Sequence, residues 1–263
     1  MPKTALPVTE TAFYLPRGEH TFEPTRATES PWDRGAQHGG PPAALLAHLM
    51  SPGGDLRLAR ISVDFLGPIP RREFLIEVSP LKPGRLTYLA EARMVIDGKV
   101  AVTARGWHIA TGPKPPRQTD PRMAPALPAG ETEHAFPGLD DWRYGAAIEW
   151  RFTSGRIAMN GPSEVWTRVR LPLVDGEEIT GQARTLIVAD AANGLSAELP
   201  IAEWLSIPPT MTTTLMRPAD GEWVHLACHT ELAADGLGLS HGDLYDAAGH
   251  LGEVSQPLLV RHR

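Results

Sequence analysis

The residues best suited to chemistry stand just before an apolar stretch of the sequence. His38 is followed by Gly39 and Gly40, and Pro41 and Pro42 then open a run of small apolar residues. Proline suits the first turn of a helix, where its missing N–H would be unpaired anyway. Glycines let a ligand approach the backbone, and free amides at a helix start attract a carbonyl oxygen or an anion. His38, Gly39 and Gly40 are therefore candidates for holding a substrate carbonyl, although His38 could also serve only to shape the turn.

Two helices are expected to carry these groups and a buried acid. Residues 39–50 and 181–199 are apolar on nearly every side, which is typical of a helix wrapped by other structure. The second of them contains Asp190. A carboxylate in such a helix could act on a substrate, cap a turn or pair with a buried arginine.

Strands are predicted around each helix, and their order repeats. The first set is predicted at 11–14, 21–28, 56–66, 74–78, 86–96 and 100–109, and the second at 148–153, 164–171, 211–216, 223–232, 237–245 and 251–260. Asp97-Gly98 lies between two alternating runs, which is a strong hairpin signal, and it pairs in the repeat with Ala248-Gly249. The sequence therefore predicts two copies of an α+β fold in which an antiparallel sheet wraps one central helix.

A proline-rich stretch separates the two copies. Seven prolines fall between Thr111 and Asp141, which favours an extended segment over a packed element. The predicted division is a first unit at 1–112, a linker at 113–141 and a second unit at 142–263.

Composition limits the partners and the cellular compartment that are expected for this chain. The net charge of −6 argues against nucleic acid or an anionic membrane surface as a partner. The single cysteine, Cys228, the absence of a signal-like start and the absence of a long apolar run favour a cytoplasmic protein. The histidines and acids between 225 and 243 lack a recognised ligand spacing, so no metal site is expected.

The whole arrangement resembles the hotdog fold, and two fused copies resemble the double-hotdog acyl-CoA thioesterases of type II (TesB-like). The resemblance covers nearly the whole chain outside the linker and is carried by four stretches: Gln37–Leu46, Asp64–Pro68, Ala189-Asp190 and Asp246–Gln256. It implies an enzyme that hydrolyses a fatty acyl-CoA, or a related acyl thioester, without metal or organic cofactor.

The same resemblance implies the roles of single residues. In this family, the water that attacks the thioester is activated by an acid on the second helix, a hydroxyl on the next strand and a glutamine near the C-terminus. Asp190 and Gln256 match by position, and either Thr210 or Thr212 would supply the hydroxyl, because a gapless comparison puts Pro208 at that place. His38, Gly39 and Gly40 would form the oxyanion side, since in hotdog pairs one copy's helix start faces the other copy's site.

Counting from the paired glycines sets Asp190 against His48 and Gln256 against Arg105, so the two copies differ where the chemistry is expected. Two alternatives stay open: a non-catalytic acyl-CoA-binding hotdog protein, and a hotdog hydratase or dehydratase, whose Asn-Pro-Leu-His type of motif is not found. The acyl chain length, the carrier (CoA or acyl carrier protein) and assembly into a homo-oligomer stay open as well.

Overall fold

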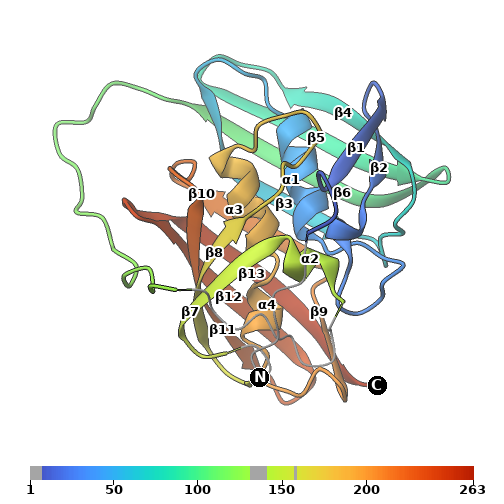
Figure 1. Cartoon of the computed structure of the whole chain (residues 1–263). Coiled ribbons are helices and arrows are strands. Elements are labelled where there is room, and N and C mark those ends of the chain that lie inside the picture. The colour runs from blue at the N-terminus through green and yellow to red at the C-terminus, as the bar shows by residue number, and fades with distance from the viewer. Residues whose placement is uncertain (1–7, 131–140, 157–158) are drawn as a thin grey trace.

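A computed structural model describes residues 8–130, 141–156 and 159–263 of the chain (Figure 1). Its two halves share one order of elements, two strands, a long helix and four strands, and each half also has short elements of its own. The first half contains β1 (Tyr14–Gly18), β2 (Thr21–Pro24), a 3₁₀ turn η1 (Arg26–Thr28), α1 (Gly40–Leu49), β3 (Leu56–Phe65), β4 (Phe74–Lys82), β5 (Thr87–Ile96) and β6 (Lys99–Ala110). The second half contains α2 (Arg143–Ala146), β7 (Ile148–Ser154), β8 (Ser163–Val169), α3 (Gly181–Ala189), α4 (Ala192–Leu195), β9 (Trp204–Ile207), β10 (Thr210–Leu215), β11 (Trp223–Leu232), β12 (Leu237–Asp246) and β13 (Gly249–His262).

One antiparallel sheet runs through both halves. Its order is β1-β2-β4-β5-β6-β3 and then β10-β13-β12-β11-β8-β7, with β9 paired to β13 off this path. The two halves meet where β3 pairs with β10, and on either side of this seam the strands follow in the same relative order. The predicted repeat, a sheet wrapped around one helix in each copy, is confirmed.

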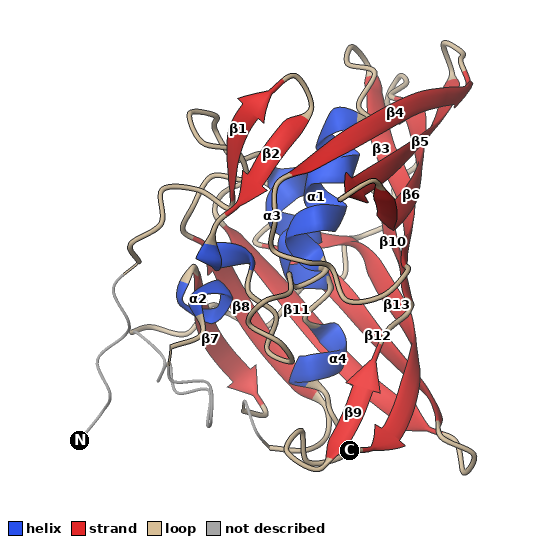
Figure 2. Cartoon of the chain, turned by 90° about the vertical axis from the view of Figure 1, so that its right-hand side faces the viewer, coloured by secondary structure: helices blue, strands red, loops and turns tan. Residues whose placement is uncertain are grey.

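The helices α1 and α3 lie side by side on the inner side of the curved sheet (Figures 1 and 2). Residues Ala43 to Ala47 of α1 are at most 1% exposed. A side chain at Gly40 would place its Cβ 2.1 Å from the carbonyl oxygen of Ile187 in α3. The glycine is therefore required by the close approach of the two helices, and it permits the short distance between the two halves.

Two predicted elements differ from the structure at the N-terminal end. The strand expected at 11–14 is displaced to β1, which begins at Tyr14, and the strand expected at 21–28 ends at Pro24. Its last part turns instead into η1, because the Thr25 hydroxyl accepts the Ala27 N–H and caps a helical turn.

The second helix is also shorter than predicted. The helix expected at 181–199 ends at Ala189, with Asp190 as its C-cap, and α4 restarts at Ala192. The cause is a tertiary contact, since the backbone N–H of Asn193 donates to Oε1 of Gln256 at 3.2 Å. In an unbroken helix that N–H would bond to the carbonyl of Ala189.

The proline-rich segment crosses the outer face of the second half's sheet. Residues 111–130 contain no helix or strand. The carbonyl of Pro125 accepts the Trp166 indole N–H at 3.0 Å, and the guanidinium of Arg122 lies over the ring of Tyr245 in β12. Residues 131–140 lie outside the described residues, so the division at 112 and 141 stays a prediction.

Replacing Gly40 with alanine should separate α1 from α3 and lower the free energy of unfolding by about 3 kcal/mol, because a Cβ cannot fit against the Ile187 carbonyl. Urea denaturation measures the loss. Gly194→Ala is the matched control, since its Cβ would meet open space in α4. Equal stability of both variants would contradict the close helix contact.

His225 makes the fold sensitive to acid. Its side chain is fully buried beside the rings of Trp166 and Tyr245, and burial lowers its pKa from 6.5 to about 4. The unfolded chain therefore binds a proton near pH 6.5 that the folded chain takes up only near pH 4. The stability contributed by neutral His225 is complete above pH 6.5 and is lost as the pH falls toward 4.

Between pH 7 and pH 5, this one group should reduce the free energy of unfolding by about 2 kcal/mol. Urea denaturation at the two pH values should show this loss in the wild type and a loss smaller by that amount in His225→Gln. His108, whose pKa burial also lowers, is present in both proteins and cancels in the comparison. Identical pH dependence in both proteins would refute the assignment.

Candidate active site

A largely apolar cavity of about 940 Å³ opens between the two halves. Its lining comes from the loop before α1, the turn after β3, the start of β7, the segment from α4 to β9 and the prolines before β10. The lining includes the side chains of Trp32, His38, Phe65, Trp142, Trp150, Asp190, Asn193, Leu195, Leu199 and Ile201. The cavity has the size of a small-molecule site and contains few polar groups.

Asp190 places a carboxylate in the wall of this cavity. It is 6% exposed and stands at the C-terminal end of α3. Oδ1 accepts a hydrogen bond of 2.9 Å from Nε2 of Gln256, and Oδ2 lies 2.9 Å from Nδ1 of His38. The two halves therefore meet at this carboxylate, because His38 comes from the first and Gln256 from the second.

Gln256 is held at both ends of its amide. Besides the bond to Asp190, its Oε1 accepts the backbone N–H of Asn193, and the side chain is fully buried on β13. The Nδ2 of Asn193 donates to the carbonyl of Ser206 in β9 at 3.0 Å. These bonds fix the orientation of the amide and direct Nε2 toward the carboxylate.

His38 is fixed by a ring stack and by the carboxylate. Its imidazole lies 4.0 Å from the ring of Tyr144, nearly parallel at 10°. The Gly40 N–H also points at Nδ1, at 3.3 Å. Nδ1 cannot both accept from Gly40 and donate to Asp190. The shorter contact with the carboxylate favours the tautomer that carries the proton on Nδ1.

Tyr144 is positioned by the end of α3. Its hydroxyl donates to the carbonyl of Ile187 at 2.7 Å, which pairs one of the free carbonyls of that helix end. Burial, with the charge of Asp190 as a second cause, raises the pKa of Tyr144 well above 10. The phenol therefore stays protonated and keeps this bond.

The two glycines of the helix start have different surroundings. Gly39 lines the cavity, and a Cβ there would lie 2.9 Å from Oδ2 of Asp190 and 2.6 Å from the Phe65 ring. Its N–H has no hydrogen-bond partner within the described ranges. Gly40 is buried against Ile187 and is not part of the lining. Of the two amides predicted to face a carbonyl, only that of Gly39 borders the cavity.

The structure does not bring either candidate threonine to the cavity. The Thr210 hydroxyl donates to the carbonyl of Val63 at 2.8 Å, and that of Thr212 lies 3.2 Å from the Ser62 hydroxyl. Both contacts cross the seam between β10 and β3. Pro208 and Pro209 line the cavity in their place.

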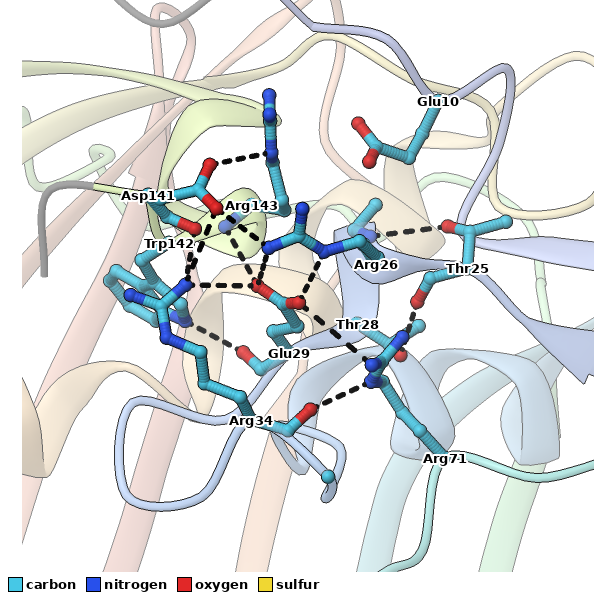
Figure 3. A network of polar contacts seen from close by, with 12 residues as sticks. Glu10, Thr25, Arg26, Thr28, Glu29, Arg34, Arg71, Asp141, Trp142 and Arg143 are labelled. Atoms are coloured by element: carbon cyan, nitrogen blue, oxygen red, sulfur yellow. Dashed lines mark hydrogen bonds and ion pairs between the residues drawn. The ribbon is translucent and has the colours of Figure 1, made fainter.

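A buried acid supports the loop that carries His38. Glu29 is 1% exposed, and its carbonyl accepts the Trp142 indole N–H at 2.7 Å (Figure 3). Its carboxylate accepts from Arg26 at 2.6 Å and from the Arg143 backbone N–H at 3.3 Å. Glu29 thus connects the His38 loop with α2, the short helix that presents Tyr144.

In the structure, the first-half residues that correspond to Asp190 and Gln256 differ from those found by counting from the glycines. The turn that matches Asp97-Gly98 is 247–248, because Gly249 already begins β13. Gly106 therefore corresponds to Gln256, as each faces the equivalent strand residue, Ala90 and Ser240.

At the end of α1, Met50 holds the C-cap position that Asp190 holds in α3. A Cβ on Gly106 would lie 3.2 Å from the Met50 methyl group. His48 is at the surface, 3.3 Å from Glu177, and Arg105 pairs with Glu91. The first half thus has an apolar contact where the second half has the acid and the amide.

Comparison with protein families gives two matches along the chain. The N-terminal domain of acyl-CoA thioesterases matches residues 28–109, and the C-terminal domain matches residues 117–260. The chain belongs to the acyl-CoA thioesterase family. It is a double-hotdog, TesB-like protein and is assigned to the thioester hydrolases. A comparison with curated protein sequences finds no match.

Solved structures share the fold of this thioesterase at low sequence identity. A protein of unknown function with a hotdog fold from Alicyclobacillus acidocaldarius superposes with a TM-score of 0.71 at 16% identity, covering 92% of each chain. The acyl-CoA thioesterase II TesB2 of Mycobacterium marinum gives 0.63 at 16% identity, covering 93% of this chain and 92% of its own. The TesB protein of Mycobacterium avium subsp. paratuberculosis gives 0.67 at 16% identity, covering 95% and 97%.

Two residues of the site were not singled out from the sequence. Asn193 belongs to no motif, and Tyr144 lies just after the proline-rich stretch without any motif. The break in the helix at Asp190 would have pointed to Asn193, but that break depends on a residue 63 positions away.

No helix of the described residues is long and apolar enough to cross a membrane.

Removing the threonine hydroxyls should leave thioester hydrolysis unchanged. Thr210→Val and Thr212→Val each delete a hydroxyl that bonds to β3 and does not line the cavity. We expect kcat/KM for an acyl-CoA to stay at the wild-type value in a thiol-release assay, with a small loss of stability. Loss of turnover in either variant, with the fold intact, would show that a threonine hydroxyl takes part in hydrolysis, as the family pattern implies.

Proposed function

We propose that the chain hydrolyses a fatty acyl-CoA to the free acid and CoA at Asp190. The observation that carries this proposal is the pairing of both carboxylate oxygens, one with Gln256 and one with His38, in the wall of an apolar cavity. A carboxylate fixed in this way can orient a base, and the cavity has room for an acyl chain.

The acyl chain would occupy the part of the cavity formed by the second half. Trp150, Leu195, Leu199 and Ile201 line this part and offer an apolar environment. The thioester carbonyl would lie next to Gly39, whose N–H is available to the oxyanion that develops on the carbonyl oxygen. This is the oxyanion role that the sequence predicted, carried by one glycine amide.

The attacking water would be activated by His38. Nε2 takes a proton from the water as its oxygen attacks the carbonyl carbon, and Asp190 stabilises the imidazolium through Nδ1. When the C–S bond breaks, the proton passes from Nε2 to the leaving sulfur. Gln256 keeps Asp190 in place through Oδ1. Cys228 takes no part as a nucleophile, since burial raises its pKa to about 11.

His38 thereby replaces the hydroxyl of the family's pattern as the third group of the site, beside Asp190 and Gln256. The missing hydroxyl also favours a second candidate, a protein that binds acyl-CoA without hydrolysing it. Binding without release of free thiol would support this second candidate.

Asp190→Asn and His38→Gln should each lower kcat by about 100- to 10,000-fold, because the imidazole loses either its orienting charge or its basic nitrogen. A thiol-release assay across acyl-CoA lengths measures turnover. Binding of CoA by calorimetry is the control, and it should be retained in both variants. Wild-type kcat in His38→Gln with loss in Asp190→Asn would show that Asp190 acts on the water directly. Wild-type kcat in Asp190→Asn would refute the proposal.

A further inference from the structure

The short helix α4 forms the wall of the cavity next to the carboxylate. The chain restarts as α4 at Ala192, two residues after Asp190, and the helix packs against β11 and β12 on the inner side of the second half's sheet (Figure 2). The cavity lining follows this segment through Ala191, Asn193, Gly194, Leu195, Ala197 and Leu199. This segment therefore leads from the carboxylate into the part of the cavity assigned to the acyl chain.

One side of α4 is fixed against the sheet. The Cβ of Ala192 would lie 3.6 Å from a Cβ on Gly242 in β12, and the Ser196 hydroxyl lies 2.7 Å from the Thr230 hydroxyl in β11. Successive residues of an α-helix are rotated by about 100° about its axis. Gly194 stands midway between Ala192 and Ser196 in sequence, so it faces about 160° away from both. A side chain at this position would point away from the sheet.

The space in front of Gly194 belongs to the cavity. A Cβ on this residue would have no heavy atom of the described residues within 4 Å. Gly194 is exposed, whereas its neighbours Asn193 and Leu195 are buried, and all three line the cavity. A side chain at Gly194 would therefore extend into the cavity.

Gly194 is not explained by the conformation or the packing of α4. Its φ is not positive, and no close contact of the described residues excludes a Cβ. Glycine inside a helix is less favourable than alanine by about 1 kcal/mol. What the glycine does provide at this position is an unobstructed cavity.

The position of Gly194 sets which acyl chains meet it. It follows Asp190 by four residues, about one helical turn, through residues in the helical region of φ and ψ. With the thioester at Asp190, a butyryl chain would end before Gly194, and an octanoyl chain would have to pass it.

We propose that Gly194 determines the acyl chain length that this site accepts, by leaving room for chains longer than butyryl to pass α4. The inference rests on the function proposed for Asp190 and specifies its substrates as medium and longer acyl chains. A larger side chain at residue 194 occupies the space of the methylene groups beyond the fourth carbon. Leu195 and Leu199 then remain as apolar lining that only longer chains reach.

Binding of thioether analogues tests the proposal without turnover. S-octyl-CoA and S-butyl-CoA cannot be hydrolysed, and calorimetry measures the Kd of each. Gly194→Leu should weaken binding of S-octyl-CoA by about 10-fold or more, because each methylene group kept out of an apolar site weakens binding by about fourfold. Its Kd for S-butyl-CoA should stay within about twofold of the wild-type value. Gly194→Ala should give an intermediate loss for S-octyl-CoA.

Gly112→Leu is the matched control for the size and polarity of the new side chain. Gly112 also has no described atom within 4 Å of its Cβ position, and it lies outside the cavity lining. Both Kd values should be unchanged in this variant. Urea denaturation should show that Gly194→Leu is at least as stable as the wild type, since leucine favours a helix over glycine.

Kinetics then extends the test to hydrolysis. The ratio of kcat/KM for octanoyl-CoA to that for the shortest acyl-CoA hydrolysed should fall by about 10-fold or more in Gly194→Leu. Equal losses for long and short chains, an unchanged ratio, or a wild type that binds S-octyl-CoA no more tightly than S-butyl-CoA would overturn the proposal. Absence of hydrolysis with the expected Kd values would overturn only the function proposed for Asp190.

Discussion

The carboxylate of Asp190 sets the main constraint on this structure. It stands at the C-terminal end of a buried helix, where the helix dipole disfavours a negative charge and little water can solvate it. Such a group is tolerated only when donors pair with its oxygens. Gln256 and the His38 ring supply them, and each of these is fixed by a further contact, Gln256 by Asn193 and His38 by Tyr144. The geometry of the site therefore depends on a series of contacts that starts at the Asp190 carboxylate.

These contacts involve residues of both halves. The donor from the first half precedes α1, and the acid ends α3, so the two helices must pack at a fixed separation. Gly40 permits this separation, and the pairing of β3 with β10 keeps the halves in register. Glu29 adds a third connection through Trp142 and Arg143. Geometry at the carboxylate is thus set by contacts spread over the whole interface between the halves.

Local patterns predicted most of the fold. The alternating strands, the hairpin at Asp97-Gly98 and the helix start at Pro41-Pro42 depend on neighbours in sequence, and the structure contains all three. The structure also brings together Asp190 and Gln256, the two residues that the resemblance matched to the family's acid and amide. Two departures from the expected structure depend on contacts between residues far apart in the sequence. Asn193 breaks the second helix because Gln256 takes its N–H, and the strand after Pro208-Pro209 directs the hydroxyls of Thr210 and Thr212 at β3. No spacing in the sequence encodes either contact.

The apolar contact of Met50 with Gly106 has a consequence for the chain as a product of duplication. Two copies of the second half alone would carry two acids but no histidine before the helix, since residues 174–180 contain none. Two copies of the first half would carry histidines and no acid. Neither half alone therefore supplies both groups, and a mixed pair assembled from separate chains would compete with the two like pairings, which lack either the histidine or the acid. Covalent fusion removes that competition, because it delivers the two unlike halves in a fixed one-to-one ratio and gives one centre per polypeptide.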